Sequence, residues 1–178
     1  MTRLTRTIAL VGMMGVGKSS VGRRLATRLG VEFRDSDSEI EAAAGCSINE
    51  IFDRYGEAAF RDGERKVITR LLAMPPQVLA TGGGAFIDDE IRDAIKRTCV
   101  SVWIRAPLEL LVDRVGRRNT RPLLRDGDLT ENVARLLKER EPIYAEADIV
   151  VESEDGPHGL QVERMIKALE ERGLVEAP

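Results

Sequence analysis

The hydrophobic residues of this chain occur in short runs that alternate with longer stretches of helical spacing. In one such stretch Val21, Leu25 and Leu29 lie four residues apart and Gly30 follows as a stop signal. The apolar runs are typical of buried strands, and they occupy residues 7–11, 31–33, 78–81, 100–104 and 148–151. Strands that alternate with helices need crossover connections, so the pattern predicts an α/β protein with a mainly parallel sheet.

The first apolar run leads into a glycine-rich turn. Residues 12–19 read G-M-M-G-V-G-K-S, which fits the phosphate-binding pattern G-x-x-x-x-G-K-[ST], and a helical stretch follows. In such a loop the backbone N–H groups attract phosphate oxygens, the Lys18 side chain reaches the outer phosphates and the Ser19 hydroxyl can bind Mg²⁺. A turn with a chance Lys-Ser pair is the alternative. The strand before the loop and the helix after it favour nucleotide binding.

Composition and charge narrow the class of protein. The chain has 178 residues, 43% of them hydrophobic, with 27 basic and 30 acidic side chains and a net charge of −3. We expect one domain without a nucleic-acid or membrane partner, because the balance is slightly acidic and no run approaches the ~18 apolar residues of a membrane span. Cys46 and Cys99 lack metal-type spacing, and we expect no signal peptide before the first strand. We therefore expect a cytoplasmic protein, and nothing demands more than a monomer.

Candidate ligand-binding residues follow the second and third runs. Asp35 and Asp37 come after the second run, where an extended backbone would turn both carboxylates to one side, at the strand end where parallel sheets bind ligands. Residues 82–84 are three glycines after the third run, and they suit the close approach of a ligand to bare backbone. A solvated acidic turn and a merely flexible turn are the alternatives. Beside a phosphate loop, we expect Asp35 to support Mg²⁺ and Asp37 to accept a substrate hydroxyl.

Two arginines lie beside apolar positions of helical stretches. Arg61 precedes Glu64 by three residues at the border of an apolar face. Arg140 continues the inward stripe of Val133 and Leu136, where an unpaired charge would cost several kcal/mol. A protein carboxylate could pair with it, its head could reach solvent from the helix end, or an anionic substrate could bind its guanidinium bidentately. Two arginines, an aspartate and bare glycine backbone together suit a small hydroxylated carboxylic acid.

Two longer stretches do not fit simple crossovers. Residues 39–74 are too long for one crossover and contain a capping box, S-I-N-E, at residues 47–50. Residues 116–130 lack periodicity and overlap a segment with five arginines and no acid between Arg114 and Arg125. Near a phosphate site such a loop favours a lid that carries Arg121 onto the phosphates. An arginine that only aids solubility is the alternative.

His158 and Trp103 are conspicuous single residues to which the sequence assigns no chemistry. His158, the only histidine, follows Gly156-Pro157, and we expect it in a surface turn. A histidine-based mechanism is therefore not expected. Trp103 alternates with apolar neighbours in a strand, so we expect it in the core.

Taken together, these motifs resemble the shikimate kinases, small kinases of the nucleoside-monophosphate-kinase type. The resemblance runs from about residue 8 to residue 151, with motifs in the same order: G-M-M-G-V-G-K-S, D-S-D, F-R-D-G-E, G-G-G-A, R-P-L-L and R-E-P-I-Y. It implies a three-layer α/β/α P-loop kinase fold with a five-stranded parallel sheet. Inserted substrate-binding helices would lie at about residues 36–74 and an arginine-rich lid at about 114–129. The implied reaction is ATP- and Mg²⁺-dependent phosphorylation of the shikimate 3-hydroxyl.

The resemblance also implies roles for individual residues. Lys18, Asp37 and Arg121 would be catalytic, and Ser19 and Asp35 would hold Mg²⁺. ATP would contact Gly12, Met13, Met14, Gly15, Val16, Gly17, Lys18, Ser19, Ser20, Arg114 and Arg121. Shikimate would contact Asp37, Phe52, Phe60, Arg61, Gly82, Gly83, Gly84 and Arg140. The chain departs from the family at residues 153–157, which read S-E-D-G-P where a basic or amide side chain is expected in the adenine loop.

Two other functions stay open at this point. One is another P-loop kinase, for a sugar acid such as gluconate or for a nucleotide. The arginine-and-glycine set suits a compact acid better than a base. The other is a nucleotide-dependent binding protein without transfer activity, although the N-K-x-D run of a guanine-binding switch does not occur.

Overall fold

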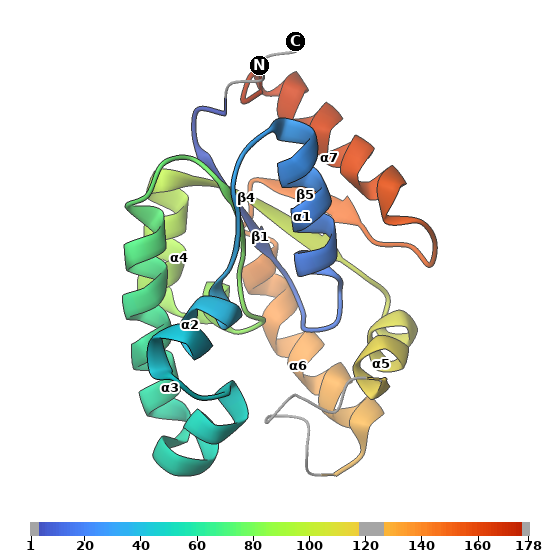
Figure 1. Ribbon diagram of the computed structural model, residues 1–178. Coiled ribbons are helices and arrows are strands. Elements are labelled where there is room, and N and C mark those ends of the chain that lie inside the picture. The colour runs from blue at the N-terminus through green and yellow to red at the C-terminus, as the bar shows by residue number, and fades with distance from the viewer. Residues whose placement is uncertain (1–3, 118–126, 176–178) are drawn as a thin grey trace.

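Five strands form one sheet at the centre of the protein (Figure 1), a computed structural model in which residues 4–117 and 127–175 are described. The strands lie in the order β2-β3-β1-β4-β5, and every neighbouring pair is parallel. Their bounds are β1 (Thr7–Val11), β2 (Phe33–Asp35), β3 (Val78–Ala80), β4 (Cys99–Arg105) and β5 (Ile149–Glu152). The predicted five-stranded parallel sheet is confirmed.

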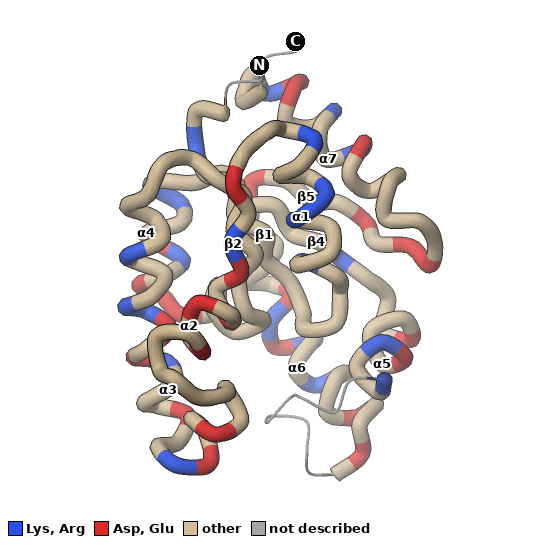
Figure 2. Tube along the Cα trace, viewed as in Figure 1, with Lys and Arg blue, Asp and Glu red and all other residues tan. Residues whose placement is uncertain are grey.

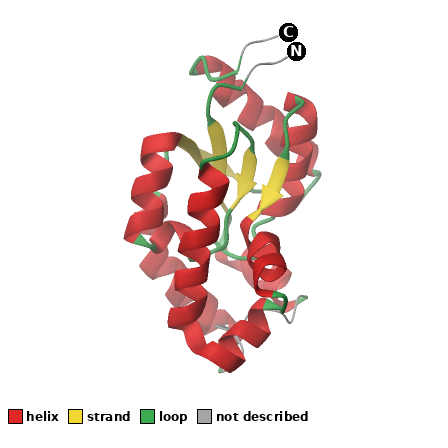
Figure 3. Cartoon of the chain, turned by 60° about the vertical axis from the view of Figure 1, so that its left-hand side comes forward, coloured by secondary structure: helices red, strands yellow, loops and turns green. Residues whose placement is uncertain are grey.

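Helices cover both faces of this sheet. They are α1 (Lys18–Leu29), α2 (Ser36–Ala44), α3 (Ile48–Leu72), the 3₁₀ turn η1 (Ala85–Ile87), α4 (Asp89–Thr98), α5 (Leu108–Gly116), α6 (Leu129–Tyr144) and α7 (His158–Glu171). Figures 1 and 3 show α1 and α7 over one face and α3, α4 and α6 over the other, so the fold has the predicted three layers. None of the helices in the described ranges is long and apolar enough to cross a membrane.

The sheet is buried most deeply at its centre. Every side chain of β1 is buried, as expected for a parallel strand covered on both faces. A second, smaller apolar cluster joins α2 to α3 and includes Ile40, Ile51, Phe60 and Leu71. Because β1, β2 and β3 are parallel, their carboxyl ends lie at one edge of the sheet, next to α2, which follows β2 directly.

The second strand lies two residues later than its apolar run predicts. Gly30 ends α1 in the left-handed conformation with φ +67°, and the Val31 N–H donates to the carbonyl oxygen of Ala26, so this turn uses the first residue of the run. The strand then ends at Asp35, which caps α2. Asp37 lies in the first turn of that helix. The prediction that Asp35 and Asp37 share one extended strand is therefore wrong.

The two long stretches between strands contain helices. The capping box of α3 is confirmed, because the Ser47 hydroxyl accepts from the N–H of Glu50 at 3.1 Å and the Glu50 carboxylate accepts from the N–H of Ser47 at 2.8 Å. The chain bends within α3 at Gly56, where φ is +83°. The predicted lid begins in α5 and ends at the start of α6. Its residue Arg121 lies outside the described residues.

Candidate active site

The loop between β1 and α1 is shaped by its glycines. Gly12, Gly15 and Gly17 all have positive φ, which brings consecutive N–H groups to one side of the loop. At Gly12 a β-carbon would lie 2.6 Å from a carbonyl oxygen of β4. Met13 and Val16 point their side chains into the core, so they can offer a ligand only their backbone. The loop forms an anion cradle at the N-terminus of α1.

Lys18 begins α1, and its side chain folds back over the loop. Its Nζ donates hydrogen bonds to the carbonyl oxygens of Gly12 at 2.6 Å and Met13 at 2.9 Å. The side chain is 9% exposed. An ammonium group held at the mouth of an anion cradle is placed to neutralise a chain of phosphates.

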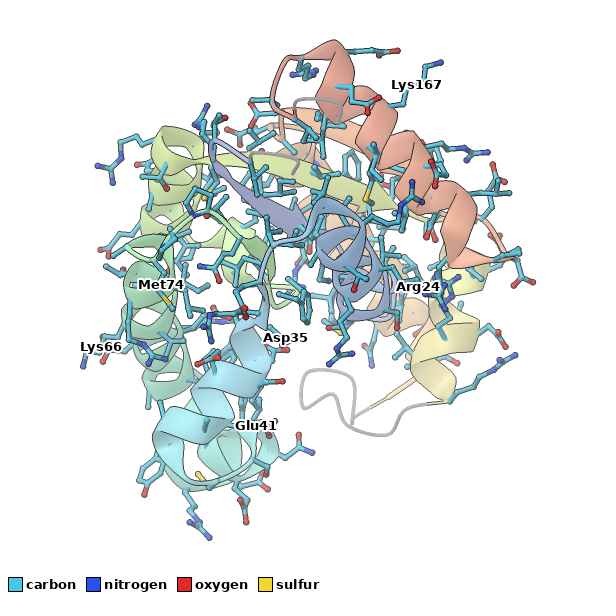
Figure 4. All side chains as sticks on the ribbon, turned by 45° about the horizontal axis from the view of Figure 1, so that its top comes forward. Arg24, Asp35, Glu41, Lys66, Met74 and Lys167 are labelled. Atoms are coloured by element: carbon cyan, nitrogen blue, oxygen red, sulfur yellow. The ribbon has the colours of Figure 1, made fainter. Side chains whose placement is uncertain are left out.

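Ser19 and Asp35 join the start of α1 to the end of β2. The Ser19 hydroxyl donates to Asp35 Oδ2, while Asp35 Oδ1 accepts the N–H groups of Asp37 at 3.0 Å and Ser38 at 3.2 Å. Figure 4 shows Asp35 at the start of α2, where the helix leaves the sheet. Mg²⁺ binds through hard oxygen atoms, commonly one or two carboxylates together with substrate phosphates. The Ser19 hydroxyl and the Asp35 carboxylate beside the cradle fit this ion.

A first pocket of about 250 Å³ opens over the loop and is lined by Lys18, Ser19, Ser20 and Arg114, among others. Arg114, on α5, donates a hydrogen bond to the carbonyl oxygen of Val16 at 2.9 Å and lies 3.4 Å from the Ser153 hydroxyl. It therefore ties α5 and the segment after β5 to the phosphate loop.

Three residues that line the first pocket, Thr81, Arg117 and His158, are not among those predicted for the site. Arg117, at the end of α5, lines the pocket, and so does His158, the first residue of α7. His158 is expected in a surface turn, whereas in the structure it is the first residue of α7 and lines this pocket. Its ring is half-buried, with Cε1 3.5 Å from the position of a β-carbon on Gly17. No local residue pattern indicates this contact, because it joins residues that are far apart in the chain.

A second pocket of about 430 Å³ adjoins the first, and the two share Ser19, Asp35, Asp37, Gly82 and Gly83. Figure 2 shows acidic positions where β2 meets α2, and Asp35 and Asp37 in this region line both pockets. The residues predicted to bind the acid all line this second pocket: Asp37, Phe52, Phe60, Arg61, Gly82, Gly83, Gly84 and Arg140. Met14 was grouped with the nucleotide residues, but its side chain lines the second pocket.

Arg61 enters the second pocket from α3 and is held by a buried carboxylate. Its Nη1 donates to Glu64 Oε1 at 2.9 Å, and Glu64 is fully buried. Burial raises the pKa of Glu64, an effect that Arg61 opposes and Asp37 reinforces. The guanidinium also lies 5.0 Å from the ring centroid of Phe60, which packs at 4.9 Å against Phe52. Arg61 is therefore oriented on two sides.

Arg140 reaches the same pocket from α6 and is 7% exposed. Its buried Nη1 has no hydrogen-bond partner, and no ion pair links it to a carboxylate, within the part of the chain that the structure describes. Tyr144, one turn further on, donates its hydroxyl to the carbonyl oxygen of Gly83. Burial raises the pKa of Tyr144 to about 12, so the hydroxyl keeps its proton and remains a donor.

The three glycines after β3 make room for the charged side chains of this pocket. A β-carbon on Gly82 would lie 2.7 Å from Asp37 Oδ1, and one on Gly83 would lie 3.3 Å from Arg140 Nη1. On Gly84 it would lie 2.5 Å from both Nη atoms of Arg61. From the sequence, we expect these glycines to let a ligand approach the backbone closely. In the structure, protein side chains already occupy the space that larger residues would need.

Comparisons with known proteins agree with this arrangement. The family model for shikimate kinase matches residues 14–170. The shikimate kinase of Paramagnetospirillum magneticum is 60% identical over 167 residues, which are 94% of this chain and 86% of that protein. The shikimate kinase of Caulobacter vibrioides is 58% identical over 164 residues, 92% of this chain and 82% of that protein.

A solved structure extends the likeness to three dimensions. The shikimate kinase from Acinetobacter baumannii in complex with shikimate superposes with a TM-score of 0.91 at 38% identity, and the match covers 94% of each chain. The match to the family model and the high identity over nearly the whole chain are decisive. This chain belongs to the shikimate kinase family.

Proposed function

We propose that this protein is a shikimate kinase, which transfers the γ-phosphoryl group of ATP to the 3-hydroxyl group of shikimate and releases ADP. The observation that carries this proposal is the shared wall of the two pockets. A phosphate cradle lies on one side, and a socket with two arginines lies on the other. Both substrates can then bind next to each other, because the two pockets share five lining residues: Ser19, Asp35, Asp37, Gly82 and Gly83.

The acid side suits the carboxylate of shikimate. Arg61 is fixed by Glu64 and Phe60, and Arg140 offers a buried Nη1 that no described residue satisfies. An anionic oxygen at this point would supply the missing partner, because a guanidinium binds a carboxylate through a planar fork. Asp37 lies on the shared wall, where it would orient the substrate hydroxyl and accept its proton.

Transfer would depend mainly on positioning and charge neutralisation, since phosphoryl transfer needs little covalent help from the protein. Lys18 would neutralise the outer phosphates from its place over the loop. Mg²⁺, held by Ser19 and Asp35, would supply further positive charge beside the phosphates. Arg121 would add a positive charge on closure of a lid at residues 114–129, and residues 36–74 would form the substrate-binding insertion of a single kinase domain.

We also propose that the enzyme acts in the cytoplasm as a monomer. Cys46 and Cys99 are free thiols, as expected in a reducing compartment. One chain supplies the residues named for both pockets, so a second copy is not required to complete them.

The proposal is tested by coupled assay of ADP release with shikimate or gluconate as acceptor. We expect ADP release that requires shikimate and Mg²⁺, with gluconate close to background. Lys18→Ala should lower kcat by orders of magnitude while the thermal midpoint of unfolding changes little. ADP release that is faster with gluconate, or independent of any acceptor, would refute the proposed function.

A further inference from the structure

We propose that His158 binds the nucleoside portion of ATP, and that Gln161 positions its imidazole ring. This inference rests on the proposed function, because it assigns a residue to the nucleotide side of that reaction. It also gives a role to the only histidine of the chain.

The layout of the two pockets determines which end of the nucleotide lies near His158. The transferred phosphoryl group must face the acid, so the outer phosphates belong at the shared wall. His158, Arg114 and Arg117 line the first pocket and not the second. They therefore lie on the side of the first pocket that is not shared with the second. A nucleotide with its outer phosphates at the shared wall would place its nucleoside toward this side.

Local geometry places the His158 ring beside the cradle. Helix α7 packs along α1 (Figure 1), and its first residue, His158, lines the pocket over the loop. Cε1 of His158 lies 3.5 Å from the position of a β-carbon on Gly17, and Arg114 Nη1 lies 3.8 Å from that same position. The imidazole and the guanidinium thus both lie beside the last glycine of the loop, where a β-carbon would be in van der Waals contact with each.

Gln161 determines which ring nitrogen is available. Its side chain is 4% exposed, and its Oε1 lies 3.4 Å from His158 Nδ1. An amide oxygen only accepts hydrogen bonds, so it favours the neutral tautomer that donates from Nδ1, and in that tautomer Nε2 is an acceptor. An acceptor matches a ribose hydroxyl or an amino group of the base. It does not match a phosphate oxygen, which needs a donor.

The direct test uses the ring resonances of His158, which are unambiguous because the sequence has no other histidine. The untagged protein is titrated separately with ADP, pyrophosphate and shikimate while the imidazole C–H signals are followed by NMR. We expect saturable shifts with ADP and little change with pyrophosphate or shikimate. Unchanged signals with ADP would overturn the inference. Equal shifts with pyrophosphate would also overturn it, because they would assign the contact to phosphate.

Kinetics test the same contact in turnover. His158→Ala should raise the KM for ATP at least fivefold, while kcat and the KM for shikimate stay within twofold. Gln161→Ala should act in the same direction to a smaller extent, and His158→Gln should recover part of the loss. Leu160→Ala is the matched control, because Leu160 lies in the same turn of α7 and is 61% exposed. Equal rises in both KM values for His158→Ala would indicate a merely structural role and contradict the inference.

The two proposals fail separately. A wild-type protein that binds ADP with shifts at His158 but does not phosphorylate shikimate would refute the proposed function alone. A wild-type protein that phosphorylates shikimate, but whose His158 resonances do not shift when ADP is added, would refute only the role of His158.

Discussion

The guanidinium of Arg61 lies against Gly84 so closely that a β-carbon there would come within 2.5 Å of both Nη atoms. The same guanidinium donates to the buried carboxylate of Glu64. Gly84 and Glu64 therefore confine Arg61 from two directions, and the position of this cation depends on the absence of a side chain at residue 84.

Replacing Gly84 with alanine should displace Arg61 and weaken acid binding. The end of an arginine side chain is flexible, so the methyl group should move the guanidinium rather than unfold the protein. We expect the KM for shikimate to rise about tenfold, roughly 1.4 kcal/mol, with the KM for ATP unchanged. Steady-state kinetics with each substrate varied in turn measure both values.

Gly63→Ala is the matched control for this change. Gly63 lies in α3, and a β-carbon there would meet no atom within 4 Å. Alanine in a helix is more favourable than glycine, by about 0.5–1 kcal/mol, so this variant should be stabilised with normal kinetics. An unchanged KM for shikimate in Gly84→Ala would contradict the role assigned to the contact.

Truncating Arg140 should affect the acid and spare the nucleotide. Arg140→Ala removes a charged donor, a loss of about 1.5–3 kcal/mol, so the KM for shikimate should rise by roughly one to two orders of magnitude. Tyr144→Phe removes only the hydroxyl that bonds Gly83 beside Arg140, and it should raise the same KM several-fold. Equal loss of apparent affinity for ATP and shikimate in Arg140→Ala would refute the carboxylate role.

Asp35→Asn should separate the two roles of this residue. Asparagine caps helices as well as aspartate does, so α2 should keep its cap and the free energy of unfolding should change by less than about 0.5 kcal/mol. The loss of charge should raise the Mg²⁺ concentration needed for half-maximal activity about tenfold. Mg²⁺ titration of activity, beside urea unfolding, gives both numbers. An unchanged Mg²⁺ requirement would show that Asp35 serves only as a cap.

Glu64 should make the stability of the protein depend on pH. Burial raises its folded-state pKa, whereas in the unfolded chain it ionises near its reference pKa of about 4.3. Its contribution to stability is therefore fully present below that pH and is lost as the pH rises through the folded-state pKa. Glu64→Gln cannot ionise, so its stability relative to the wild type should increase with pH.

Urea unfolding of both proteins at several pH values from 4 to 7.5 measures this difference. Taking the difference between the two proteins removes the contributions of the other titrating groups that they share. A difference in unfolding free energy that stays constant, or that changes in the opposite direction, would contradict the burial effect.

Local signals allowed the phosphate loop and the sheet to be predicted. The conformation of residues 12–19 depends on the glycines and Lys18 within that same turn, so the motif alone predicts it. The apolar runs predict the buried strands. The strand order could not be derived from these runs, since right-handed crossovers permit several orders. Aspartate is also a preferred N-cap residue, so Asp35 could have been predicted to begin a helix at Ser36 instead of continuing the strand.

The remaining features depend on contacts between distant segments. Nothing near residue 158 in the sequence indicates that the start of α7 reaches Gly17. The bond between Tyr144 and the carbonyl oxygen of Gly83 also joins segments that are 61 residues apart. Both contacts form only when the helices pack on the sheet, so local residue patterns do not predict them.

The most direct test of the central claim identifies the product of the reaction. Shikimate, ATP, Mg²⁺ and the protein are incubated together, and the product is analysed by ¹H–³¹P correlation NMR. A shikimate kinase predicts one new phosphate ester, with its phosphorus coupled to the proton on carbon 3, formed in step with ADP. Inorganic phosphate as the sole new phosphorus species, or an ester at another hydroxyl, would contradict the account.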